Sequence, residues 1–359
     1  MIMSGKIFSW LTTAIICSLL LTAGCAPLAE ETAKPEVEPE KEKPKVVVEE
    51  VKPEVEIEEK VPTVELALKF ERGDLTTYNV ITEAQRNIKA EGSLSNDSTF
   101  KGGTTSNRVE MTFTQQIQSV DDKGNAVAKI TIEELKYLSV IKDNPILDFD
   151  STREKDRRNP LAKLIGQSYT IEIAPTGKVT KVIDVTQALA AVSGRSPARK
   201  TALSLLKPGV IKQRHGILAL PVTDKNQLRT GDNWSSVKTF NFGLMGSKSY
   251  EKIYTVKEIK DQDKRKVAIV EMNAIPSSEI AEQLHKEQLP AIFSKMFDNI
   301  ETYTGRLELD LTAGKVEKYL EKLQTEWVAV DPFAGQKDDK EPAVLKMSAT
   351  RFYSLEKID

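Results

Sequence analysis

Alternation of apolar and polar residues dominates the chain from residue 63 onward. The clearest stretch is 126–135, where apolar side chains alternate with charged and hydroxyl ones, and the same period of two recurs over 168–173 and 307–312. A period of two is typical of strands that bury one face. Glycine-containing turns follow or precede these stretches, so the pattern predicts antiparallel hairpins.

Helical periodicity is confined to two places. Residues 184–209 predict two short helices, and 277–300 place apolar residues at helical spacing with Pro290 as a kink or break. The candidate caps and stops of the first place are Asp184 or Thr186, Ser196, Gly194 and Pro208. The fold class expected from both patterns is mainly β with a few helices (α+β).

Three features recur in the same order along this region. The matched segments are 71–80 with 229–240, 115–130 with 254–270, and 168–183 with 303–320. We therefore expect two similar antiparallel β-sheet units, 63–215 and 216–359, forming a sandwich or half-barrel and joined by short helices. The alternative is chance recurrence of hairpin chemistry within one large sheet, since such turns are common.

The N-terminus has the layout of a secretory signal peptide over 1–24. Lys6 precedes an apolar run without charge that ends in small residues, and the run is short for a permanent transmembrane helix. Residues 21–25, LTAGC, resemble the lipobox of bacterial lipoproteins, although Thr22 stands where Leu is usual. The resemblance implies cleavage between Gly24 and Cys25 and acylation of Cys25. An uncleaved anchor or an ordinary cleaved signal is the alternative.

Residues 25–62 are expected to be a lipidated N-terminus and a disordered tether. From 26 to 62 the chain holds 12 Glu, 6 Lys and 6 Pro and no glycine or aromatic residue, which leaves nothing to build a core around. Proline with charged neighbours favours an extended, semi-rigid spacer. The alternatives are a binding tail for a basic partner and an arm that spans the cell wall.

Charge and cysteine content limit the locations and the partners that can be expected for this protein. The region from 63 onward holds 44 basic and 41 acidic residues, and this balance argues against a nucleic-acid partner. Cys17 would leave with the signal, so no disulfide is expected in the mature chain. With Ala26 after the acylated cysteine, we expect the outer membrane facing the periplasm in a Gram-negative cell, and otherwise the outer face of the cell membrane.

The search for catalytic or metal chemistry finds little, and no cofactor is expected. His215 and His285 lie far apart with no second ligand near either, so no metal site is predicted. GRSPA at 194–198 lacks the second glycine of a nucleophile elbow. Gly177-Lys178 and Gly314-Lys315 lack the other residues of a phosphate loop and are interpreted as turns.

Other candidate motifs have ordinary structural explanations. Arg72-Gly73-Asp74 spells an adhesion tripeptide, but the recurrence of its Gly-Asp pair at Gly231-Asp232 indicates turn chemistry. Basic clusters at 153–158 and 195–214 could contact anionic lipid headgroups or cell-wall polymers, or form solvated faces. Glu308 and Asp310 share one face of a predicted strand, and no catalytic role is assigned to them.

The order of Gly-Asp strand starts and Gly-Lys-Val hairpins over 64–320 resembles an uncharacterised family of β-rich bacterial lipoproteins, and more distantly the half-barrel lipoproteins that carry lipids. The resemblance supports the fold and implies no activity. Our first hypothesis is a membrane-anchored, non-enzymatic envelope lipoprotein that binds an envelope protein, cell-wall or lipid partner. The second is a carrier of a lipid or other hydrophobic ligand in a curved sheet. The third is a carboxylate-based hydrolase.

Overall fold

A computed structural model describes residues 63–92, 102–192, 197–221, 227–242, 246–262, 264–277, 297–330 and 344–358. All of them belong to one compact unit, 59–359. The predictions for residues 1–62, including Gly24 and Cys25, lie outside the described residues, as does His285.

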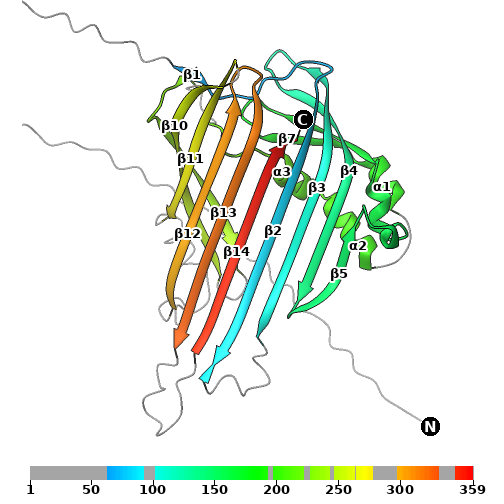
Figure 1. The fold of residues 1–359 in the computed structure, drawn as a ribbon, viewed down its shortest axis with the longest axis vertical. Helices are drawn as coiled ribbons and strands as arrows, with labels where there is room; N and C mark the ends of the chain where they lie inside the picture. Colours follow the sequence, from blue (N-terminus) through cyan, green and yellow to red (C-terminus); the bar gives the residue numbers. More distant parts are fainter. Residues whose placement is uncertain are drawn as a thin grey trace, which may run out of the picture. The chain divides into compact units, whose positions relative to one another are not determined.

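The described chain is mainly β (Figure 1). The strands are β1 (Val64–Glu65), β2 (Leu75–Glu91), β3 (Gly103–Val120), β4 (Ala126–Ile141), β5 (Asn144–Asp150), β6 (Ser168–Ile173), β7 (Val179–Asp184), β8 (Gln227–Leu228), β9 (Asn233–Asn241), β10 (Ser247–Gln262), β11 (Arg265–Pro276), β12 (Phe297–Asp310), β13 (Lys315–Val330) and β14 (Val344–Lys357). The α-helices are α1 (Thr186–Ala191), α2 (Pro197–Leu205) and α3 (Pro208–His215), and the 3-10 helices are η3 (Glu154–Asp156) and η4 (Pro160–Leu164).

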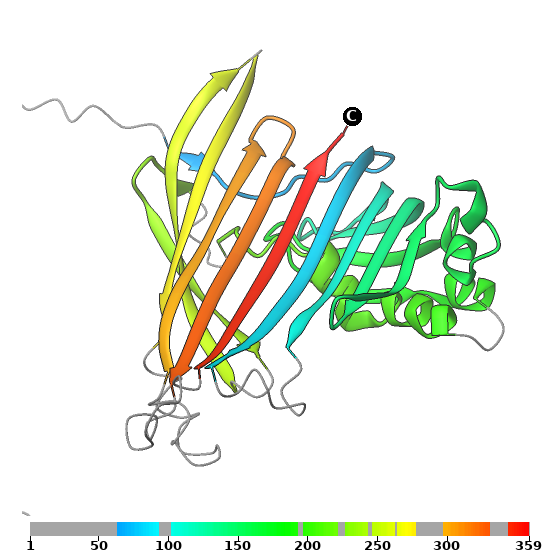
Figure 2. The same ribbon diagram turned by 60° about the horizontal axis from the view of Figure 1, so that its bottom comes forward.

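One large antiparallel sheet contains nearly all the strands. Its order is β7-β6-β4-β3-β2-β14-β13-β12-β11-β10-β9, with β5 added to β4, and the small second sheet pairs β1 with β8. The segments 63–215 and 216–359 therefore do not form separate sheets, because β2 and β14 pair along their lengths. Figure 2 shows that the sheet is bent, with the β9 end turning back behind the middle strands. Its end strands β7 and β9 do not pair with each other within the described residues, so the sheet is open.

The period of two explains why these segments are strands. In β4 the residues from Ala126 to Ile132 alternate between buried and half-buried, as the sequence pattern predicts. Tyr169, Ile171 and Ile173 of β6 are likewise buried. The inward faces of β3, β4 and β6 pack with the three α-helices, where α1 contacts β6 and α3 contacts β7. None of the helices in the described part of the chain is long and apolar enough to cross a membrane.

The helical predictions are correct in part. Two of the predicted helices exist as α1 and α2, and Asp184 accepts a hydrogen bond from the backbone N–H of Thr186 at 2.8 Å. The second predicted helix, α2, ends at Leu205, shortly before the predicted stop Pro208. Pro208 also begins a further helix, α3, which was not predicted, at a position where the missing N–H of proline costs no hydrogen bond. Of the second place, 278–296 lie outside the described residues, and 297–300 are strand rather than helix.

The turns with paired glycines have matching local hydrogen bonds. Gly73 N donates to Ile117 O at 2.8 Å, and Gly231 N donates to Val256 O at 2.8 Å. Asp74 and Asp232 accept in return at 2.9 and 3.0 Å, and the two glycines have φ of +95° and +93°. Each turn leads into a long strand, β2 or β9. The similarity of two whole units stays a prediction.

Candidate functional site

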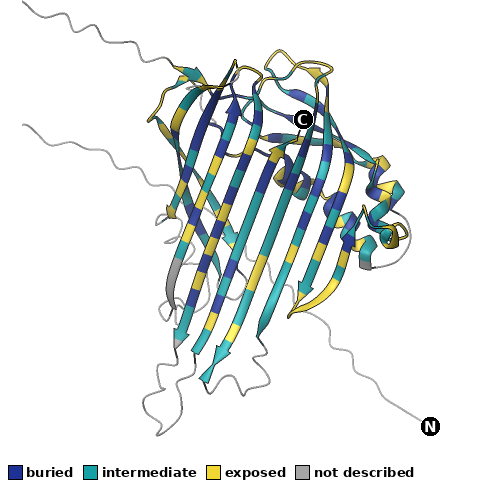
Figure 3. Cartoon of the chain, in the orientation of Figure 1, coloured by how far each residue is buried: buried dark blue, intermediate teal, exposed yellow. Residues whose placement is uncertain are grey.

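The inward face of the sheet changes from packed to open along the strands. Side chains of neighbouring strands lie side by side in rows set by the register, and one row joins Leu355, Val80 and Met111, all buried. The next row joins Tyr353, Thr82 and Val109, of which only Val109 is buried. Figure 3 shows the same gradient, with buried residues concentrated toward one end of the central strands.

A cavity of about 310 Å³ begins where the packing ends. We call it the upper cavity. It lies between α2 and α3 on one side and the inward face of the sheet on the other, and strands from both halves of the chain line it. Its apolar and aromatic wall is formed by Val109, Tyr137, Leu205, Val210, Phe240, Tyr303 and Tyr353. The volume lies within the range of small-molecule sites, about 300–1,000 Å³.

A second cavity of about 380 Å³, the lower cavity, adjoins the first. Ala84, Asn107 and Arg351 line both cavities, so the two share a wall. Phe242 and Trp327 meet edge to face in the lower cavity, with ring centroids 5.0 Å apart. Together the cavities offer an elongated space with aromatic side chains at both ends.

Arg214 enters the wall of the upper cavity from the end of α3. Its side chain is only 2% exposed. Nη2 donates to the carbonyl oxygen of Leu205 at 3.2 Å, while Nη1 has no hydrogen-bond partner among the described residues. Tyr353 donates its hydroxyl to the carbonyl oxygen of Arg214 at 2.9 Å, which ties α3 to β14. A buried cation is thus fixed in place with donors left over.

Arg351 lies on β14, two residues before Tyr353, on the same inward face. It is half-buried, and burial lowers the pKa of its guanidinium. It has no hydrogen bond or ion pair within the part of the chain that the structure describes. Two arginines with unused donors therefore line one cavity.

Glu321 on β13 is the buried carboxylate of the site, and it is saturated with partners. Lys252 Nζ lies 2.9 Å and Lys238 Nζ 3.1 Å from its oxygens, Tyr303 donates at 2.7 Å, and Tyr319 donates to it as well. Burial alone would raise the pKa of Glu321, but the two lysines and the hydroxyl donors outweigh burial and hold the pKa at about 2. Glu321 therefore stays ionised and takes no part in proton transfer near neutral pH.

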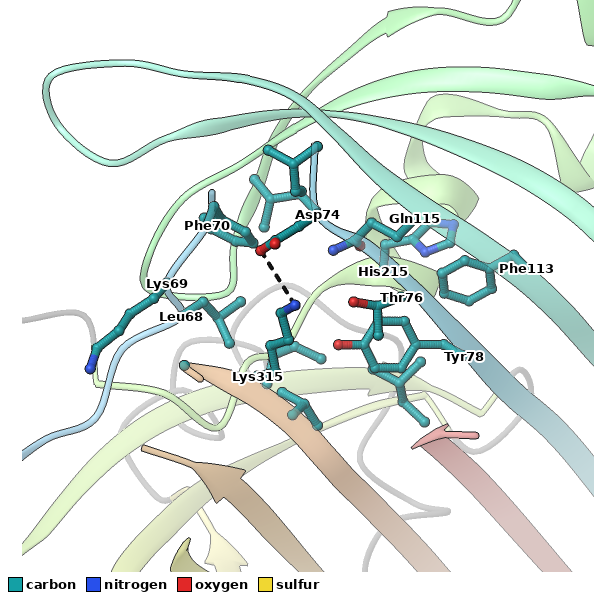
Figure 4. A pocket seen from close by; sticks show the side chains of 16 residues that line it. Leu68, Lys69, Phe70, Asp74, Thr76, Tyr78, Phe113, Gln115, His215 and Lys315 are labelled. Atoms are coloured by element: carbon teal, nitrogen blue, oxygen red, sulfur yellow. Dashed lines mark ion pairs between the residues drawn. The ribbon is translucent and has the colours of Figure 1, made fainter. Parts of the chain in front are cut away.

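A third cavity, of about 40 Å³, lies near the Gly73 turn (Figure 4). Lys315 Nζ reaches Asp74 at 3.3 Å on one side, and His215 lies on the other wall among Phe113 and Gln115. His215 Nε2 is 2.6 Å from the hydroxyl of Tyr169. Burial first, and then the charge of Arg214, hold the pKa of His215 well below its usual value. The space suits ordered water rather than an organic ligand.

The residues singled out in the sequence are distributed as follows. His215 is a buried neutral side chain, and no group of metal-ligating side chains occurs among the described residues. Asp310 is buried rather than solvent-facing, because its carboxylate accepts from the backbone N–H groups of Thr312 and Ala313 in the hairpin turn. Arg153 is paired with Asp148 and Asp156, so it is part of a local ion-pair cluster. Gly177 and Gly314 lie in hairpin turns.

Sequence reasoning missed the two arginines and Glu321 as site residues. Arg214 lies in the basic segment 195–214 that was considered for anionic headgroups, but its burial depends on α3, which the sequence did not predict. Arg351 and Glu321 sit at inward positions of alternating strands. A charged residue at an inward position is the one signal that could have found them.

Comparisons with known proteins give limited context. No family model matches the chain, and no curated sequence matches it. A structure described as "Lipid-protein interactions in lipovitellin" aligns with a TM-score of 0.39 at 11% identity over 81% of this chain, which spans only 26% of that chain. DynF from the dynemicin biosynthesis pathway of Micromonospora chersina aligns with a TM-score of 0.19 at 8% identity over 84% of this chain and 91% of DynF. Both scores lie below 0.5, where a common fold does not follow.

Proposed function

We propose that the chain is a cell-envelope lipoprotein, held to a membrane through acyl chains on Cys25, whose β-rich body binds an amphiphilic ligand in its upper and lower cavities. The observation that carries the binding role is the pair of adjoining cavities of about 310 and 380 Å³ on the inward face of the sheet. A module that only contacts other proteins needs no such space, because close packing of the interior is the stable default.

Hydrolysis by paired carboxylates is less well supported. A glycosidase-type site needs one carboxylic acid that keeps its proton and a second carboxylate opposite it. Two acidic residues border the upper cavity, Glu83 and Glu321, and of these only Glu321 lies on the inward face, since Glu83 shares the opposite face of β2 with Ile81. Glu83 pairs with Arg108 at 2.9 Å, and Glu321 is held ionised by its lysines. The lowered pKa of Glu321 is the opposite of what an acid catalyst requires.

Ligand binding can be tested with residues 59–359, the compact unit that holds every described residue. Mass spectrometry of molecules that copurify with this unit should detect amphiphiles. The neutral fluorescent probe N-phenyl-1-naphthylamine should bind, and Ala84→Trp should weaken its binding at least about tenfold, because Ala84 lies in the wall common to both cavities. Ile81→Trp is the matched control, since Ile81 lies on the opposite face of β2. Equal binding by the two variants, or no probe binding at all, would refute the proposal.

A further inference from the structure

We propose that the ligand carries one anionic head group, a carboxylate or a phosphate, and that Arg214 and Arg351 bind it while the apolar part of the ligand extends into the lower cavity. This inference rests on the proposed binding function and specifies its ligand class.

Arg214 supplies the first argument. An ionised side chain that is 2% exposed is costly unless a counter-charge or a full set of hydrogen bonds compensates it. Arg214 donates to Leu205 O and to the hydroxyl of Tyr169, and Nη1 has no hydrogen-bond partner among the described residues. A guanidinium has five donors, and it cannot become neutral in a protein. Arg214 lines the upper cavity and has no anionic partner among the described residues, which points to a ligand with negative charge.

Arg351 supplies the second argument, independently of α3. It lies on the wall shared by the two cavities, and it has no anionic partner within the described chain. The inward carboxylate of the upper cavity, Glu321, cannot serve, because it already has Lys238 and Lys252 as cationic partners. Two arginines thus line one cavity, and the fork of a guanidinium is suited to bind the oxygens of a carboxylate or a phosphate.

The surroundings determine the rest of the ligand. Beyond Arg351 the lower cavity presents four buried residues: Phe242, which follows β9, and Trp327, Met347 and Ala349 of the sheet. Aromatic and aliphatic walls bind an apolar chain through the hydrophobic effect and dispersion. A small inorganic anion would use the arginines and leave these walls unused. A single-chain amphiphile uses both.

Chain-matched ligands test the inference. Displacement of N-phenyl-1-naphthylamine from residues 59–359 is measured with dodecanoate, dodecyl phosphate, 1-dodecanol and dodecyltrimethylammonium, and with acetate and inorganic phosphate alone. Dodecanoate or dodecyl phosphate should bind about 10- to 100-fold more tightly than 1-dodecanol, since hydrogen bonds to charged groups are the stronger ones. The cationic amphiphile should bind more weakly than the alcohol. The preference between the two anions identifies the head group.

Variants assign the preference to the arginines. Arg351→Met should remove most of the difference in affinity between the anion and 1-dodecanol, and it should leave the affinity for 1-dodecanol unchanged. Arg214→Met should have the same effect, provided that circular dichroism shows it to be folded. Lys322→Met is the control, because Lys322 lies on the outward face of β13 beside Glu321 and removes an equal charge. If 1-dodecanol binds as tightly as the anions, or if Arg351→Met keeps the preference, the inference is wrong and the binding function stands. If acetate or inorganic phosphate displaces the probe as well as the dodecyl anions do, the ligand is not an amphiphile. If neither the probe nor 1-dodecanol binds, the proposed function itself fails.

Discussion

Replacing Glu321 by leucine should destabilise the protein strongly, and removing Lys252 as well should restore part of the loss. In the native protein Lys252 is 1% exposed and lies 2.9 Å from Glu321, so Glu321→Leu leaves a cation buried beside a smaller, apolar side chain. Removing one partner of a buried pair costs about 3–5 kcal/mol. The hydroxyls of Tyr303 and Tyr319 lose their acceptor in the same step.

The reverse single change should be milder. In Lys252→Met the carboxylate keeps Lys238 at 3.1 Å and both tyrosine hydroxyls, so we expect a loss of about 1–2 kcal/mol. The double variant Lys252→Met with Glu321→Leu holds neither member of the pair, and replacement of a buried pair by apolar groups is often close to neutral. We therefore expect the double variant to be more stable than Glu321→Leu alone, with a coupling energy of about 2–3 kcal/mol.

Urea unfolding of the four proteins, followed by far-ultraviolet circular dichroism, measures this cycle. The pKa of Glu321 lies below its unfolded value of 4.5, so its contribution is complete above pH 4.5 and is lost as the pH falls toward about 2. The stability difference between the native protein and Glu321→Leu should shrink over that interval. A coupling energy below about 0.5 kcal/mol, or a double variant less stable than Glu321→Leu, would refute the assignment of Glu321 and Lys252 as a coupled buried pair.

Three further predictions follow from separate features. Because burial holds the pKa of His215 well below 6.5, the unfolded chain binds a proton at this residue before the native protein does. The native protein should therefore lose stability relative to His215→Gln as the pH falls below 6.5, by up to about 1.4 kcal/mol per pH unit. If urea unfolding gives the same stability difference between the two proteins at every pH, His215 is not a buried neutral side chain. Gly314→Ala should lower the free energy of unfolding by about 2 kcal/mol or more, because the added Cβ would come within 2.4 Å of Lys69 at a φ of +63°. In Gly73→Ala the added Cβ meets no atom within 4 Å, so the loss should be about 1 kcal/mol. Equal shifts of the thermal midpoint in the two variants would exclude the close approach of Gly314 to Lys69. Cys25→Ser should abolish fatty-acid labelling and membrane partition, and unchanged processing between residues 24 and 25 would place the anchor elsewhere.

The sequence predicted the strands better than it predicted the site. Alternation over 126–135 and 168–173 identified β4 and β6 because each side chain's face is a local property of an extended backbone. The pairing of β2 with β14 was not predicted, because the two strands are far apart in the sequence and a local pattern of residues does not indicate which strands pair. Helix α3 was not predicted because Pro208 was interpreted only as the end of the preceding helix, whereas proline both follows helices and begins them.

The cavities could not be predicted from the sequence, because they form where the inward face of the sheet is less closely packed than elsewhere along the same strands. Val80 and Thr82 are both inward residues of β2, yet one is buried and the other borders the upper cavity. That difference depends on where α2 and α3 cover the sheet. Arg214 shows the same dependence, because its place in the sequence suggests a solvated basic segment and only the packing of α3 buries it.

The pairing of β2 with β14 has a consequence for how the protein is made. Tyr78 pairs with Lys357 and Glu91 with Val344, so the middle of the sheet is closed by segments synthesised at widely separated times. Pairings of such long sequence separation form late, because a large loop must be ordered before they gain any contact. Ala84 and Arg351, which stand opposite each other across this seam, line both cavities. A chain whose C-terminal strand is not yet synthesised therefore lacks the wall shared by the two cavities, and this wall forms only when the seam has closed.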